Sequence, residues 1–190
     1  MAKGSGNTRS TGIQNSVDAY IQAYTAKGGP DYSLVSSGDT EKNREKFINW
    51  LDSAPKVNGD TIYRGSQILS GDILYNLIYG GWEENETIVD SSYISNNSAG
   101  ILSFTRNKES VFSYAGSKPR PNPKYDRFEN ELAHVKFTVK TSGKHFVDIS
   151  KKSHYPEERE VVAKSNTKFI YMGKQFHQVG QWWEIFLKEK

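Results

Sequence analysis

The chain has 190 residues, of which 25 are basic and 22 acidic, and the formal net charge of +3 is spread without a long basic block. This even distribution gives little support for nucleic-acid binding. Aromatic residues make up 13% of the chain and supply enough apolar surface for a folded core, which excludes a wholly disordered protein. There is no cysteine, so disulfides, thiolate metal sites and a cysteine nucleophile are excluded.

The first part of the chain is predicted to be helical. Residues 1–12 are rich in Gly, Ser and Thr and are expected to form a flexible tail, followed by a single domain over 13–190. Apolar residues recur at helical spacing over 13–25. A second helix is predicted from Thr40, a candidate N-cap, to residue 52.

The rest of the chain is predicted to be mainly strands. A further helix is expected over 70–79, residues 83–98 resist assignment, and a short helix over 108–115 leads into a Pro-rich loop at 116–127. Short segments rich in β-branched and aromatic residues indicate strands at 61–65, 99–105, 133–140, 145–150, 161–163, 167–172 and 182–188. Helices followed by strands favour an α+β fold, with two packed, mainly antiparallel sheets behind an N-terminal helical portion.

The sequence contains no segment of the length and hydrophobicity that a membrane span or a secretion signal requires. We therefore expect a soluble protein, a monomer without a membrane partner, that acts in the cytoplasm of its producer or of a target cell. The four histidines are scattered without a metal-binding spacing, so no metal site is predicted.

Two carboxylates stand two residues apart where a loop enters an apolar stretch. These are Glu158 and Glu160, directly before Val161 and Val162. In an extended chain residues i and i+2 point to the same side, so both side chains are expected to face one pocket. Alone, this pattern is common in solvated acidic turns.

The acidic pair belongs to a set of three short motifs that follow one another in chain order. They are Tyr63-Arg64-Gly65 on a predicted strand, Ser103-Phe104-Thr105 at a strand end, and Glu158-Arg159-Glu160 on a loop. Together they resemble the arginine, serine and glutamate triad of the mono-ADP-ribosyltransferases, in the arginine-specific branch with exoenzyme-type and actin-modifying toxins and phage effectors that modify host proteins. The family pattern Ser-Thr-Ser is replaced here by Ser-Phe-Thr.

The resemblance implies a site for NAD, which these enzymes consume as a cosubstrate. Arg64 would bind the pyrophosphate and Gly65 would allow backbone to approach the nicotinamide amide. It likewise implies NAD contacts for Ser103 and for three further residues, Thr105, Tyr114 and Tyr24.

The same resemblance assigns roles to the acidic loop. Glu160 would bind the ribose 2′-hydroxyl and stabilise an oxocarbenium-like transition state, and Glu158 would activate the incoming nucleophile. A Glu at the position of Glu158 points to an arginine acceptor, and Tyr155 would contact the target protein. The implied function is transfer of ADP-ribose from NAD to an arginine of a target protein, with release of nicotinamide and some NAD hydrolysis.

Two alternatives remain open at this point. The acceptor is a nucleic acid or a small molecule, or the chain is a non-catalytic protein-binding module on the same fold. Two residues of the long loop, Arg120 and Arg127, could contact adenosine, although a solvated insertion is the simpler interpretation of residues 116–127.

Overall fold

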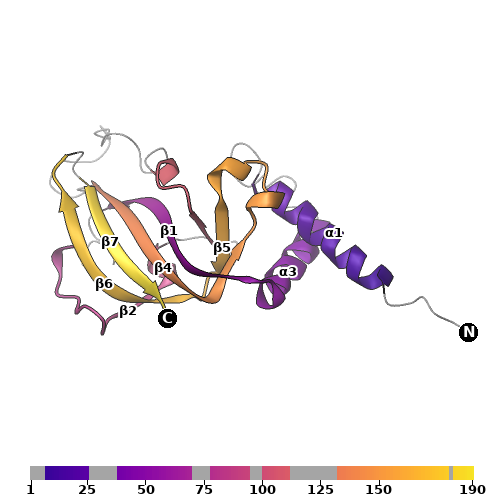
Figure 1. Ribbon diagram of the computed structural model, residues 1–190, viewed down its shortest axis with the longest axis horizontal. Helices are drawn as coiled ribbons and strands as arrows, with labels where there is room; N and C mark the ends of the chain where they lie inside the picture. The colour runs from indigo at the N-terminus through magenta and orange to yellow at the C-terminus, as the bar shows by residue number, and fades with distance from the viewer. Residues whose placement is uncertain (1–6, 26–37, 70–77, 95–99, 112–131, 180–181) are drawn as a thin grey trace, which may run out of the picture.

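A computed structural model describes residues 7–25, 38–69, 78–94, 100–111, 132–179 and 182–190 (Figure 1). Its helices are α1 (Asn7–Tyr24), α3 (Gly38–Ser53) and the single-turn α5 (Ser91–Ile94), with two short 3-10 helices, η1 (Ser150–Lys152) and η2 (Pro156–Glu158). Its strands are β1 (Lys56–Leu69), β2 (Ile88–Asp90), β3 (Ile101–Thr105), β4 (Leu132–Asp148), β5 (Glu160–Lys164), β6 (Lys168–His177) and β7 (Trp182–Glu189). The two longer helices, α1 and α3, precede the strands as predicted, while the short helices lie between strands.

The described strands form one hydrogen-bonded sheet in the order β1-β3-β5-β4-β7-β6-β2. All pairings are antiparallel except that of β4 with β7, which is parallel. The prediction of two separate sheets is therefore not met. The sheet stays continuous because residues 135–140 of β4 pair with both β1 and β7, while the end of β4, at Val147 and Asp148, pairs with β5.

Four of the strands form a closed ring of pairings. β1 pairs with both β3 and β4, and β5 also pairs with both of these strands. Within the ring, Ser103 lies opposite Val162, and Thr105 lies opposite Glu160. The ring fixes the segments that carry the predicted site relative to one another.

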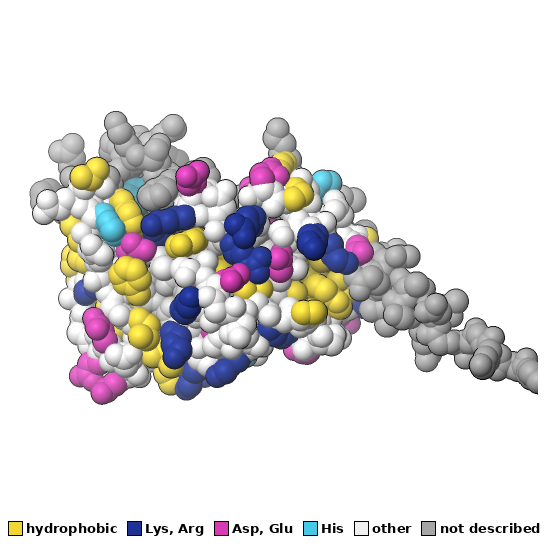
Figure 2. Space-filling view, viewed as in Figure 1, with side chains coloured by type: hydrophobic (Ala, Val, Ile, Leu, Met, Phe, Trp, Pro, Cys, Tyr) yellow, Lys and Arg dark blue, Asp and Glu magenta, His cyan; other side chains and the backbone are white. Residues whose placement is uncertain are grey.

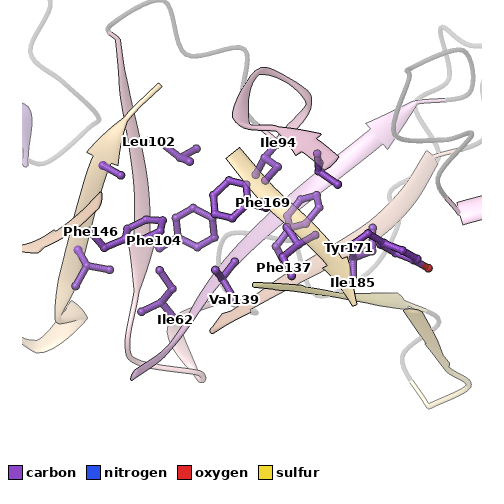
Figure 3. Packing of buried hydrophobic residues seen from close by; sticks show 14 of the residues in the cluster. Ile62, Ile94, Leu102, Phe104, Phe137, Val139, Phe146, Phe169, Tyr171 and Ile185 are labelled. Carbon is purple, nitrogen blue, oxygen red and sulfur yellow. The ribbon is translucent and has the colours of Figure 1, made fainter. Parts of the chain in front are cut away.

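Two hydrophobic cores lie on opposite faces of β3 and β5. Leu102, Phe104, Val161 and Ala163 face the larger core, where Phe104 packs edge-on against Phe146 with ring centroids 5.3 Å apart (Figure 3). The alternate residues Ile101 and Val162 face the smaller core, which α1 and α3 cover. Figure 1 shows both helices beside β5, at the end of the molecule away from β6. Both faces of this part of the sheet are thus covered.

β4 replaces the two strands that were predicted at 133–140 and 145–150. The intervening Ser142-Gly143 suggests a turn, but here Gly143 adopts a φ of +81° within a continuous strand. The buried carboxylate of Glu189, which is 1% exposed, accepts hydrogen bonds from the N–H groups of Ser142 and His145 and from the Ser142 hydroxyl. These bonds satisfy backbone groups that the irregular register leaves without a strand partner.

Other segments differ from their predicted bounds. α1 begins at Asn7, so residues 7–12, which were assigned to the tail, are helical; the apolar spacing starts only at Ile13 and could not indicate this first turn. β2 and α5 occupy residues 88–94 of the region that resisted assignment. Residues 70–77 of the helix predicted at 70–79, residues 112–115 of the helix predicted at 108–115, and the whole loop at 116–127 lie outside the described residues. None of the helices described is both long and apolar enough to cross a membrane.

Glu189→Ala is expected to lower the free energy of unfolding by roughly 2–4 kcal/mol, because it leaves buried backbone donors without an acceptor. Denaturant unfolding of the variant and the wild type measures this difference. Glu86→Ala, at an exposed glutamate, is the matched control and should change stability little. Equal stability of the two variants would contradict the role of Glu189.

Candidate active site

The alternation of side chains along β3 and β5 places polar groups together beside α1. Ser103, Thr105 and Glu160 lie on the same face as Ile101 and Val162, two or four residues further toward the strand ends. There the Ser103 hydroxyl donates a hydrogen bond to Oε1 of Glu160. The face that is apolar near the helices becomes polar at this edge.

Arg64 reaches the same place from β1. Its Nη1 donates a hydrogen bond of 2.7 Å to the backbone oxygen of Ser103. Burial lowers the pKa of Arg64, while its interactions with Tyr24 and Glu160 oppose that shift. Arginine starts from such a high pKa that the guanidinium stays charged. The positive charge of Arg64 therefore interacts with the Glu160 carboxyl group. Gly65 follows Arg64 in β1.

Glu160 is the most perturbed acid of the site. Its pKa is raised to about 7: burial is the largest cause and the charge of Glu158 adds to the rise, whereas the Ser103 hydrogen bond and Arg64 oppose it. Desolvation and a neighbouring like charge are the usual causes of such a shift at functional carboxylates. At neutral pH this carboxyl group is divided between its protonated and ionised forms.

Tyr24, on the last turn of α1, borders this cluster. Its ring is partly exposed, but its hydroxyl lies away from water and forms a hydrogen bond with Ser103. Burial and the charge of Glu160 raise the pKa of Tyr24, so the phenol stays protonated. The structure thus brings Tyr24, Arg64, Ser103 and Glu160 into one group.

The backbone between Glu158 and Glu160 differs from the predicted extended conformation. The chain is not extended here: Glu158 ends η2, and Arg159 follows with φ 52° and ψ 48° in the left-handed region. The two acids still interact, since the Glu158 charge raises the pKa of Glu160. Glu158 is partly exposed, and Tyr155 lies at the start of the same turn, where its N–H donates to the Ser153 hydroxyl at 3.0 Å.

The C-terminal end of α1 holds the chain that leads into this turn. Thr25 accepts a 3.0 Å hydrogen bond from the N–H of His154, and the Gln22 side chain donates to the carbonyl of Lys152. Lys152 also forms an ion pair with Asp18. Helix α1 therefore positions Tyr24 and the acidic turn together.

Two residues at the end of β3 have positions that the sequence did not predict. Thr105, expected to contact NAD, donates its hydroxyl proton to the carbonyl of Glu158. Arg106, which no sequence motif singled out, forms ion pairs with Asp60 at 2.7 Å and Asp148 at 2.6 Å. The sequence signal for these ion pairs was an arginine directly after the Ser-Phe-Thr segment, together with aspartates in other predicted strands. Which aspartates pair with Arg106 depends on the fold and could not be predicted from the sequence.

The departure from Ser-Thr-Ser at Phe104 has a structural reason. Phe104 faces the larger core, on the side of β3 away from Ser103, so its side chain takes no part in the polar cluster (Figure 3). Tyr114, predicted to contact nicotinamide, lies outside the described residues. Within the described ranges, no group of three or more potential ligands is arranged to hold a metal ion.

The fold is that of the ADP-ribosyltransferases. The chain is similar to an ADP-ribosyltransferase from Clostridium botulinum, with a TM-score of 0.60 and 12% identity over 97% of this chain and 92% of the other. It is also similar to the Vis toxin, an ADP-ribosyltransferase from Vibrio splendidus (TM-score 0.58, 18% identity, 94% of this chain and 73% of that one).

A third similar structure was solved with an NAD analogue. Exoenzyme S from Pseudomonas aeruginosa, in a complex with human 14-3-3 protein beta and bound to carba-NAD, has a TM-score of 0.59 and 14% identity over 95% of this chain and 77% of its own. Comparison of the sequence with protein-family models and with characterised proteins finds no match. The likeness to bacterial ADP-ribosyltransferase toxins is therefore one of fold.

Glu160→Gln is expected to stabilise the protein at neutral and higher pH. The folded protein keeps the Glu160 proton up to about pH 7, whereas an unfolded glutamate loses it near pH 4.5. The wild type therefore loses stability as the pH rises between these values, and Gln avoids that loss. The gain in unfolding free energy should grow by roughly 1–3 kcal/mol between about pH 4 and pH 8.

Denaturant unfolding over this pH range measures the gain, and Glu157→Gln, at an exposed neighbour in the same turn, is the control. A difference between Glu160→Gln and wild type that stays constant with pH would show that Glu160 is not protonated in the folded protein near neutrality.

Proposed function

We propose that this protein transfers ADP-ribose from NAD to an arginine side chain of a target protein and releases nicotinamide. The single observation that supports this most is the raised pKa of Glu160, to about 7, in a cluster with Ser103 and Arg64 on an ADP-ribosyltransferase fold. In such surroundings, hydrogen bonds from the protein rather than from water fix the position of a catalytic carboxylate before the reaction begins.

The residues of the cluster fit the chemistry of the substrate. Breaking the bond between nicotinamide and ribose builds positive charge on the sugar, and an ionised Glu160 next to the 2′-hydroxyl would stabilise it. The Ser103 hydroxyl fixes the direction of that carboxylate. Arg64 provides a guanidinium, which binds pyrophosphate oxygens with two parallel hydrogen bonds. Tyr24 and Gly65 would border the nicotinamide and its ribose.

Glu158 supports arginine as the acceptor. A guanidinium is protonated in water and must lose a proton as it attacks the anomeric carbon, so a nearby base is needed. Glu158 is partly exposed at the rim of the cluster and interacts with Glu160 through its charge. It can thus contact an incoming side chain while Glu160 contacts the ribose. Tyr155, at the start of the turn, would contact the target protein.

A nucleic-acid acceptor is the weaker alternative. On the face shown in Figure 2, acidic side chains lie between the lysines and arginines, which is unfavourable for tracking a phosphate backbone. A non-catalytic binding module is a further alternative, but it gives no reason for burying an acid with a raised pKa beside an arginine and a serine.

Incubation with labelled NAD and a cell lysate tests the proposal. Wild type is expected to label protein, and Glu160→Gln to lose transfer and NAD hydrolysis by about a hundredfold or more, because the neutral amide cannot stabilise a cationic sugar. Glu158→Gln should lose transfer more than hydrolysis, since water needs less help from a base.

Small-molecule acceptors test whether the modified group is the guanidine of arginine. Agmatine, which carries a guanidine, should be modified, whereas an amine of similar length should not. Label on nucleic acid rather than protein would favour the weaker alternative. Full labelling by Glu160→Gln would overturn the mechanism.

The activity is expected to fall in acid. Glu160 must be ionised to act, and its pKa is about 7, so kcat/KM for NAD should decline below about pH 7. The charge of Glu158 raises this pKa, so Glu158→Gln should shift the decline of NAD hydrolysis to lower pH. Initial rates across pH measure both effects. A profile that is flat between about pH 5 and pH 8 would contradict the assignment of Glu160.

A further inference from the structure

The end of β3 holds the turn that carries Glu158. The Thr105 hydroxyl donates to the carbonyl of Glu158 and accepts a hydrogen bond of 2.9 Å from the N–H of Asn107. The next residue, Arg106, donates its backbone N–H to the carbonyl of Arg159 at 3.2 Å. Two consecutive residues of one strand end therefore bind the two consecutive carbonyls between which the chain turns.

Arg106 also anchors this end of the strand. Its side chain, 18% exposed, forms ion pairs with Asp60 of β1 at 2.7 Å and with Asp148 of β4 at 2.6 Å. Partial burial alone would raise the pKa of Asp148, but hydrogen bonds from Ser150 and Arg106 lower it overall, so the aspartate stays charged. The end of β3 is thus connected to three other parts of the chain: β1, β4 and the acidic turn.

The contacts of Thr105 and Ser103 are separate. Ser103 binds the carboxylate of Glu160, while Thr105 binds the backbone of Glu158. Thr105 is only 8% exposed, so the carbonyl it binds has little access to water from that side once the hydroxyl is removed. Loss of the hydroxyl should therefore disturb the direction of Glu158 and leave the Glu160 hydrogen bond in place.

We propose that Thr105, braced by Arg106, is a positioning residue that fixes the direction of Glu158 and thereby sets how NAD is divided between transfer to an acceptor and hydrolysis. This inference rests on the proposed function, because it assigns Glu158 to the acceptor. It also gives Thr105 a role on the acceptor side of the site instead of the predicted contact with NAD.

A matched pair of variants tests the inference. Thr105→Val keeps the shape and removes the hydroxyl, while Thr105→Ser keeps the hydroxyl. With NAD and agmatine, the valine variant should lose transfer by about tenfold or more and hydrolysis by less than about threefold, because only the geometry of Glu158 changes. The serine variant should retain both activities. Equal loss of both activities in the valine variant, or no loss, overturns the inference.

A double variant separates positioning from a general loss of stability. Glu158→Gln removes the base that Thr105 positions. Adding Thr105→Val to Glu158→Gln should therefore cause no further loss of transfer compared with Glu158→Gln alone. Losses that multiply in the double variant would mean that Thr105 acts on something other than Glu158, and would overturn the inference.

Hydrogen exchange gives a readout that does not need activity. The backbone amides of Tyr155 and of residues 157–159 should exchange faster in Thr105→Val than in wild type or Thr105→Ser, and unchanged exchange would overturn the positioning role. If the wild type transfers no ADP-ribose to agmatine or protein, the proposed function fails. The exchange experiment still decides whether Thr105 holds the turn.

Discussion

The register between β3 and β5 is the constraint on which the site depends. Side chains alternate between faces along a strand, so a shift of β3 by one residue would turn Ser103 into the large aromatic core and Phe104 toward α1, and the same shift of β5 would turn Glu160 into that core. Packing of Phe104 against Phe146 and Phe169 opposes such a shift, since a serine hydroxyl and a carboxyl group would be costly there. The apolar side of these strands therefore keeps the polar side in place, and the closed ring of β1, β3, β5 and β4 gives the pairing little freedom to slide.

The site places two acids of the same type in different surroundings. The carboxyl group of Glu160 is desolvated beside Ser103 and Arg64, and its pKa rises to about 7. Glu158 is partly exposed and is held through its backbone by Thr105. Contrasting environments of this kind allow neighbouring carboxyl groups to perform separate steps. Two hydrophobic cores flank Glu160, because α1 and α3 cover one face of β3 and β5 and the aromatic cluster covers the other.

The local sequence pattern predicted the helices and strands better than the long-range contacts between them. Alternation and helical spacing located β3, β5, β7 and α3 to within a few residues. They failed at β4, because Ser142-Gly143 has the composition of a turn while the contact that keeps the strand continuous comes from Glu189, 47 residues away from Ser142. Arg64, Ser103 and Glu160 were named from short motifs, and the structure brings them together: the Ser103 hydroxyl donates to Glu160, and Arg64 donates to the Ser103 carbonyl. The placement of Thr105 and Arg106 depends on strand pairing, which no motif contains, and the two acids were expected to pair along an extended chain where the structure has a left-handed residue.

The left-handed conformation of Arg159 has a consequence for how such a site can change over time. In a plain strand, Glu158 and Glu160 would share one regular geometry, and an insertion or a new residue before Glu160 would alter the pairing of β5. Here the change in backbone direction at Arg159 separates a rigid segment, which begins at Glu160, from a short turn that contributes no strand pairing. Under the proposed function, substitutions in the turn would change the acceptor, while Glu160, the acid assigned to the ribose, would keep its place in β5. New specificities can then arise by substitution in a few exposed positions, without a redesign of the scaffold.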